Sequence, residues 1–131
     1  MLTDVQALVY STYLTLAMLL TASVLRARAW APPGLVIALG NRDDVPPPTA
    51  LAARADRAGK NMLEGLLLFV AAVAAARYAG VTQEKVELGA TLFFWARVVY
   101  FGVYLAGIPY LRTAVWAVAT VGTFMIARAA L

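Results

Sequence analysis

The sequence has 131 residues, of which 63% are hydrophobic and only 14% are charged, and its mean hydropathy is +0.76. An ordinary soluble domain is less apolar and more highly charged, so this composition indicates an integral membrane protein. Cysteine and histidine are both absent, which excludes disulfides, thiolate nucleophiles, imidazole bases and the commonest transition-metal ligands. We expect no metal site, and any chemistry must use Arg, Tyr, Glu and Asn side chains or a bound small molecule.

The chain divides into four apolar segments, each long enough to cross a bilayer, which takes roughly 20 residues. We expect membrane helices over about residues 4–28, 50–79, 83–108 and 110–131. These helices leave no room for a soluble domain, so residues 1–131 should form a single membrane domain with its chemistry inside the bundle or at the interface. Short connections make neighbouring helices antiparallel. The expected fold is therefore an all-α, antiparallel four-helix transmembrane bundle.

The first connection is the one sizeable loop, at about residues 31–49. Its prolines and its polar cluster predict an irregular segment that does not continue either neighbouring helix. Residues 34–40 within it are apolar. Two positions suit this stretch: along the membrane interface, or over the mouth of a cavity.

The basic residues predict the orientation in the membrane. Seven of them fall at the end that carries the first and third connections: Arg26, Arg28, Arg42, Arg54, Arg57, Lys60 and Arg112. Only Arg77, Lys85 and Arg128 fall at the other end. The positive-inside bias places the first and third connections in the cytoplasm and both termini on the opposite side. The net charge of +4 is a topology signal, and no nucleic-acid partner is expected.

Polar side chains form a stripe on the second segment. Arg54, Arg57, Asn61 and Glu64 are spaced by three, four and three residues, so they fall within about 80° of arc on an α-helix. An ionisable side chain inside a membrane segment needs a partner or a wet cavity, and it is a functional-site hypothesis for that reason.

A second stripe, of Arg97, Tyr100 and Tyr104, lies on the third segment, and Arg112 and Arg26 are expected near the cytoplasmic surface. Converging arginines form a cationic pocket, and the planar guanidinium binds carboxylates through two parallel hydrogen bonds. The Glu64 carboxylate would receive an ammonium group. The implied ligand is a zwitterion with more than one carboxylate.

These residues carry a family resemblance. R-A-D-R-A-G-K-N-M-L-E, from Arg54 to Glu64, and A-R-V-V-Y-F-G-V-Y-L-A-G-I-P-Y-L-R, from Ala96 to Arg112, resemble the MAPEG family, the membrane-associated proteins in eicosanoid and glutathione metabolism. The similarity covers the whole chain, and this member looks bacterial. It implies a homotrimer in the bacterial inner membrane that takes glutathione as cosubstrate and acts on a lipophilic molecule.

The resemblance also implies roles for individual residues. Glutathione would be contacted by Arg26, Arg57, Asn61, Glu64, Arg97, Tyr100 and Tyr104. Arg112 would be the catalytic residue, because a guanidinium hydrogen-bonded to sulfur lowers the pKa of the thiol and favours the thiolate.

The chain departs from two branches of the family. Gly65 stands where leukotriene-synthase-like members have tyrosine. Tyr100 and Thr113 stand where prostaglandin-synthase-like members have histidine and serine. These differences favour a detoxifying glutathione transferase or peroxidase, acting on lipophilic electrophiles or lipid hydroperoxides, over an eicosanoid-specific step.

Other interpretations of the same residues remain open. Glu64 and Arg97 would suit a purely structural interhelical ion pair, and Arg112 would suit contact with lipid phosphate. A non-catalytic lipid-binding or scaffold member of the family is the alternative function. A small multidrug transporter is a more distant one, because the first segment lacks an internal carboxylate.

Overall fold

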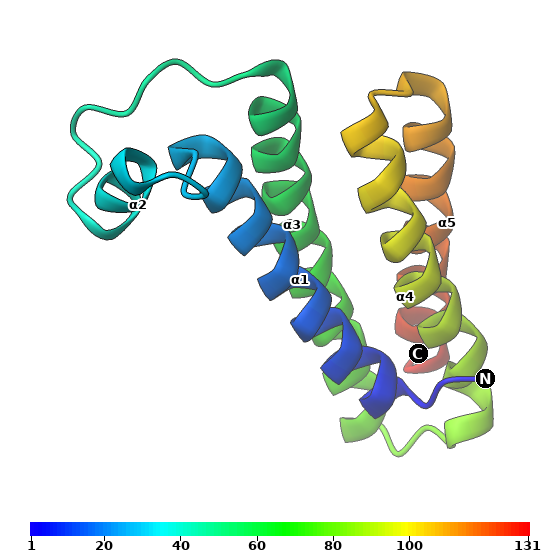
Figure 1. Cartoon of the computed structure of the whole chain (residues 1–131). Helices are drawn as coiled ribbons and strands as arrows, with labels where there is room; N and C mark the ends of the chain where they lie inside the picture. Colours follow the sequence, from blue (N-terminus) through cyan, green and yellow to red (C-terminus); the bar gives the residue numbers. More distant parts are fainter.

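Four long helices and one short helix make up the protein. The computed structural model describes residues 1–131 (Figure 1), and its helices are α1 (Asp4–Ala27), α2 (Pro32–Leu39), α3 (Ala50–Tyr78), α4 (Gln83–Ala106) and α5 (Pro109–Ala129). All except α2 are long and apolar enough to cross a membrane. The structure therefore confirms the expected all-helical bundle of an integral membrane protein.

Helices α3 and α4 form the centre of the bundle. Both contact α1 on one side and α5 on the other, whereas α1 and α5 do not touch each other. At mid-height the rings of Phe69 on α3 and Phe93 on α4 stack with their centroids 4.0 Å apart, and both side chains are buried. Away from this contact, α1 with α3 and α4 with α5 form two pairs that spread apart toward the end opposite the chain termini (Figure 1).

The α4–α5 pair packs through glycine. A Cβ atom added to Gly89 would lie 2.6 Å from the carbonyl oxygen of Gly122, and one added to Gly122 would lie 2.5 Å from that of Gly89. The two backbones therefore approach more closely than any side chain would allow, as is common between membrane helices. The turn that joins the pair is equally tight, because Gly107 adopts a left-handed conformation (φ 78°) and Pro109 starts α5.

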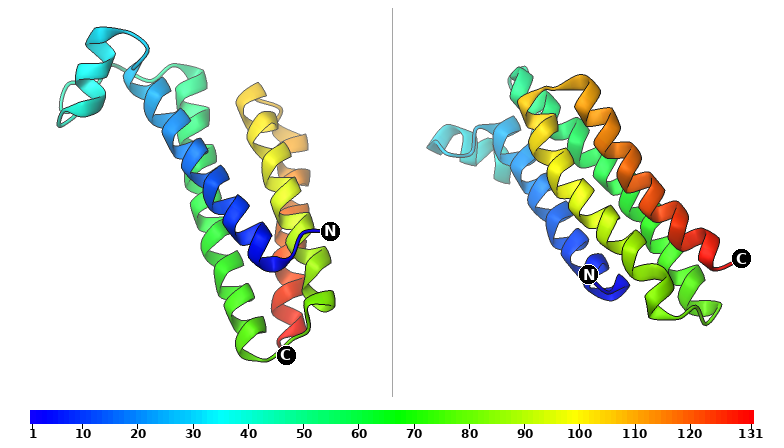
Figure 2. Two further views of the ribbon diagram at one scale, coloured as in Figure 1. Left: turned by 60° about the horizontal axis from the view of Figure 1, so that its bottom comes forward. Right: turned by 90° about the vertical axis from the view of Figure 1, so that its right-hand side faces the viewer.

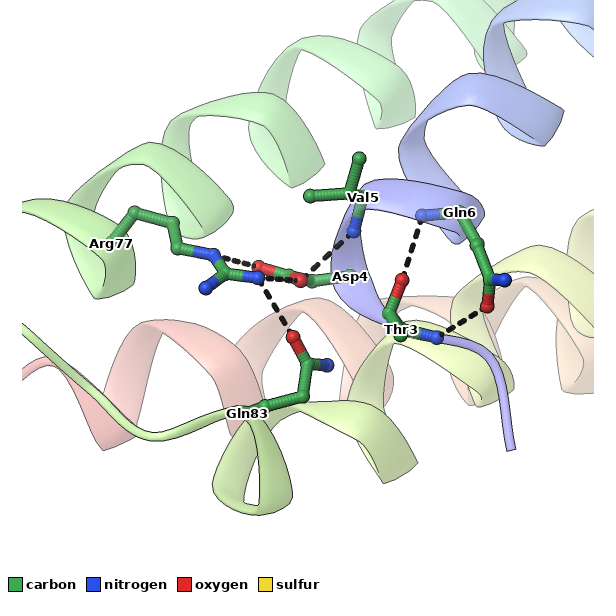
Figure 3. Close-up of polar contacts among 6 residues, drawn as sticks. All are labelled: Thr3, Asp4, Val5, Gln6, Arg77 and Gln83. Carbon is green, nitrogen blue, oxygen red and sulfur yellow. Dashed lines mark hydrogen bonds and ion pairs between the residues drawn. The ribbon is translucent and has the colours of Figure 1, made fainter.

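An ion pair joins three helices at the end of the bundle that carries the N-terminus (Figure 3). The Asp4 carboxylate is fully buried and accepts hydrogen bonds from both Nε and Nη2 of Arg77 on α3. Arg77 Nη2 also donates to the Gln83 side chain of α4, at 2.7 Å. A capping box between Thr3 and Gln6 starts α1 beside this pair. The arrangement satisfies a carboxylate that would otherwise be costly to bury.

The first connection differs from the sequence prediction. Residues 32–39 were expected to be irregular but form α2, and only about residues 40–49 lack helical structure. The prolines explain the difference, because Pro32 and Pro33 occupy the first turn of α2, where a helix needs no backbone N–H donor. Two views show α2 beside the last turns of α1 and outside the four-helix bundle (Figures 1 and 2).

Candidate functional site

A polar pocket of about 390 Å³ lies between α3, α4 and α5, at the end where the two helix pairs spread. Its lining residues are Arg57, Lys60, Asn61, Glu64, Tyr100, Tyr104, Arg112, Thr113 and Trp116. Three of these side chains are cationic and one is a carboxylate. Residues that are distant in the sequence thus meet at one site, because α3 and α4 run antiparallel and α5 turns back directly after α4.

Tyr104 links the cations of two helices. Its hydroxyl oxygen accepts a hydrogen bond from Arg57 Nε on α3, at 3.3 Å. The guanidinium carbon of Arg112 on α5 lies 4.7 Å from the centroid of the same ring, a cation–π distance. The Tyr100 ring packs edge-on against Tyr104, with centroids 5.3 Å apart. Tyr104 therefore contacts Arg57 through its hydroxyl group and Arg112 through its ring.

Arg97 is the most deeply buried cation, with 2% of its surface exposed. Its Nη1 donates a hydrogen bond to Asn61 Oδ1 at 2.7 Å. Its guanidinium carbon lies 5.5 Å from the Phe93 ring centroid and 5.3 Å from that of Tyr100, while Nε has no hydrogen-bond partner. Gly65 makes room for this group, since an added Cβ would lie 2.0 Å from Arg97 Nη2.

Glu64 and Arg97 do not form the structural ion pair that the sequence left open. The ion pairs within the chain are Lys60 with Asp56, at 2.7 Å, and Arg77 with Asp4. Arg97 bonds to Asn61 instead, and the exposed Glu64 carboxylate lines the pocket without a basic partner in the same chain. Glu64 is thus the one carboxylate that lines the pocket, and it has no ion-pair partner.

Arg26 and Arg54, which belong to the basic residues at this end of the bundle, do not line the pocket. Arg26 donates to the carbonyl oxygen of Pro46 in the first connection, so within one chain it does not meet the other candidate binding residues. Arg54 Nε donates to the carbonyl oxygen of Leu105, at 3.1 Å. A cation there satisfies a carbonyl at the C-terminal end of α4. This hydrogen bond therefore connects α3 to the end of α4, at the residue that follows Tyr104.

Lys60 and Trp116 also line the pocket, although the sequence did not place them among the binding residues. Lys60 follows Arg57 by three positions and precedes Glu64 by four, so helical spacing alone places it near the polar stripe. Trp116 lies one turn after Arg112 on α5, where it resembled an ordinary packing or interfacial aromatic. The structure places both at the pocket wall.

An apolar groove of about 790 Å³ adjoins the polar pocket. The two share Asn61, Glu64 and Trp116, and Arg97 lines the groove at their boundary. From there the groove runs between α3 and α5 along Leu68, Ala71, Ala75, Tyr78, Thr120, Thr123, Phe124 and Ala127. The two threonine hydroxyls donate to backbone carbonyls one turn earlier on α5. The groove therefore presents a nearly apolar wall that leads to a charged end.

Comparison with known proteins identifies the family of the chain. The family model of the MAPEG family matches residues 5–131, which is essentially the whole chain and includes every residue of the pocket and the groove. No curated protein and no solved structure matches the chain. The match spans all four membrane helices and both polar stripes, so this chain belongs to the MAPEG family.

Proposed function

We propose that this protein binds glutathione in the polar pocket, activates its thiol and transfers it to lipophilic electrophiles or uses it to reduce lipid hydroperoxides. One observation carries the proposal: a pocket with three cations and one unpaired carboxylate opens onto an apolar groove. Membership of a family generally associated with glutathione supports the same conclusion.

The charges of the pocket complement those of glutathione, which carries two carboxylates, one ammonium group and a thiol. Arg57 and Lys60 would bind carboxylate oxygens, since charge-assisted hydrogen bonds are the strongest available there. Glu64 would accept from the ammonium group. Asn61 and Tyr100 would contact the peptide amides, and the Arg97 bond to Asn61 would orient that amide side chain.

Arg112 would act on sulfur. It is half-buried and lies over the Tyr104 ring, and it lines the pocket together with Trp116. A guanidinium donor stabilises the thiolate relative to the thiol, and the proton leaves to water. In conjugation, the thiolate forms a carbon–sulfur bond and displaces the leaving group or opens an epoxide. With a hydroperoxide, it attacks an oxygen and cleaves the O–O bond, and with one proton taken up from water this gives an alcohol and a sulfenic acid. A second glutathione converts the sulfenic acid to the disulfide and water.

Assembly and orientation complete the proposal. A homotrimer would bring Arg26 of an adjacent subunit toward a glutathione carboxylate. Within one chain, Arg26 bonds to the Pro46 carbonyl and does not meet the other candidate binding residues. The polar pocket lies at the end of the bundle that carries the first and third connections. We propose that this end faces the cytoplasm of a bacterium and that the lipophilic substrate enters the groove sideways from the inner membrane.

Thiolate formation tests this function. Glutathione would be added to the detergent-purified protein, and the thiolate would be followed by its ultraviolet difference absorbance while calorimetry measures binding. We expect Arg112→Ala to lose the thiolate band, and about 100-fold or more of the conjugation rate, with binding retained. Arg128→Ala is the matched control, because it removes an arginine from the same helix far from the pocket and should keep both.

Three results would count against the proposal. A thiolate band of full size in Arg112→Ala would assign activation to another group. If the unaltered protein shows neither a thiolate band nor glutathione binding, the apolar groove would remain as the one candidate binding site. That result would favour the lipid-binding alternative. Full glutathione affinity in the assembled Arg26→Ala variant would exclude the contact across subunits.

A further inference from the structure

Helix α2 carries an unusual surface for a connecting segment. Its eight residues, Pro-Pro-Gly-Leu-Val-Ile-Ala-Leu, include no polar side chain. Leu35, Val36 and Leu39 are 48%, 73% and 81% exposed, and their spacing places them within about 100° of arc on one face of the helix. Gly34, Ile37 and Ala38 occupy the other side and are less exposed. In water, such an outward apolar face would be unfavourable.

The position of α2 is built into the fold. A Cβ atom on Gly34 would lie 1.9 Å from the carbonyl oxygen of Arg28, so the helix backbone rests directly on the end of α1. At its other end, Arg42 Nη2 donates both to Ser23 Oγ of α1, at 2.7 Å, and to the carbonyl oxygen of Ala38 in α2. These contacts tie both ends of α2 to α1, and they fix which face points outward.

Nothing else in the chain covers this face. Helix α2 contacts α1 and no other helix, and it projects from the side of the bundle (Figure 2). Trp30, just before α2, is 66% exposed, and Arg28, two residues earlier, is also exposed. Exposed apolar residues also continue along α1 as Leu16, Leu20 and Val24, on a helix that crosses the membrane.

We propose that α2 is an interfacial membrane anchor, whose Leu35, Val36 and Leu39 insert among lipid acyl chains just below the headgroups. Tryptophan is enriched at the membrane–water interface, and membrane binding there strengthens with the apolar area that is buried. The Arg28 guanidinium and the Trp30 indole would lie at the level of the lipid phosphates. Asp43 and Asp44 follow Arg42, so the attraction is mainly apolar and requires no particular anionic lipid.

The partner is thus the phospholipid of the same bilayer that the four long helices cross. The anchor would hold the end of α1, and the connection that leads from it to α3, at a defined depth. This inference depends on the exposed face of α2 and on its ties to α1. It does not depend on glutathione binding or on catalysis.

Tryptophan fluorescence tests the anchor. Replacing Trp95 and Trp116 by Phe leaves Trp30 as the only tryptophan, and the full chain would be reconstituted into phosphatidylcholine vesicles. We expect blue-shifted Trp30 emission, most of which is lost when bromine atoms are carried on the acyl chains near the headgroups, with less loss when they are near the chain ends. Vesicles that also contain phosphatidylglycerol should give the same depth profile.

A second variant separates insertion from folding. Val36→Asp with Leu39→Asp should shift Trp30 emission to the red and remove most of the shallow quenching, while Pro47→Asp in the exposed loop should change neither. Circular dichroism must show unchanged helix content in both. Red-shifted, unquenched emission in the parent would overturn the proposal by placing Trp30 in water. Blue-shifted emission that no brominated lipid quenches would overturn it by placing a second copy of the chain over α2.

Discussion

Replacing Gly65 by alanine should destabilise the bundle, because Gly65 provides the space that Arg97 occupies. The new Cβ would lie 2.0 Å from Arg97 Nη2 and 2.7 Å from its Cζ. The guanidinium would have to retreat by about 1.4 Å, from 2.0 Å to the 3.4 Å at which ordinary van der Waals contact begins. The Phe93 and Tyr100 rings flank it, which restricts the directions in which it can move.

The cost can be estimated from the hydrogen bond that such a shift breaks. Arg97 Nη1 and Asn61 Oδ1 are 2.7 Å apart, and a displacement of that size takes them beyond hydrogen-bond range. A hydrogen bond to a charged group contributes about 1.5–3 kcal/mol to stability. Alanine also favours the helix over glycine by roughly 0.5–1 kcal/mol, which partly offsets the loss.

Gly102→Ala is a matched control that cancels this helix term. Gly102 lies within α4, and a Cβ there would meet nothing within 4 Å. Reversible unfolding in mixed detergent micelles, followed by circular dichroism, should show Gly65→Ala less stable than Gly102→Ala by about 1.5–3 kcal/mol. Equal stability of the two variants would refute the reasoning. When Arg97 is also replaced by Gln, the stability difference between the two alanine variants should shrink, because the shorter Gln side chain no longer fills the space beside Gly65.

Three further predictions concern other contacts. Glu64→Gln should weaken glutathione binding in calorimetry by about 10-fold or more, because a charged hydrogen bond becomes neutral; unchanged affinity would remove Glu64 from the site. Arg54→Gln should lower the free energy of unfolding by about 1 kcal/mol through loss of its bond to the Leu105 carbonyl, and it should lower conjugation more than the remote Arg128→Gln does. Arg77→Gln should lower stability by about 3 kcal/mol, since it leaves the buried Asp4 carboxylate unpaired, yet glutathione affinity should persist; a loss of binding there would mean that the two ends of the bundle are coupled.

The sequence by itself determined the properties that depend on one helix at a time. Hydrophobic length alone predicted four membrane-crossing segments, because a bilayer sets the length of an apolar helix. Helical spacing placed Arg57, Asn61 and Glu64 on one face of α3, and the structure shows all three at the pocket wall. The joint pattern of the two polar stripes also indicated the family, which the whole-chain match shows.

Only the tertiary structure decided which side chains meet. Arg97 bonds to Asn61 and not to Glu64, Arg54 bonds to the end of α4, and Arg26 bonds to the first connection. These choices depend on the rotation and depth of each helix relative to its neighbours, which Gly65 and the Gly89–Gly122 contact help to set. Spacing along one helix carries no information about that rotation. The apolar groove exists only because α3 and α5 come together in space. The outer face of α2 is exposed only because no other helix covers it.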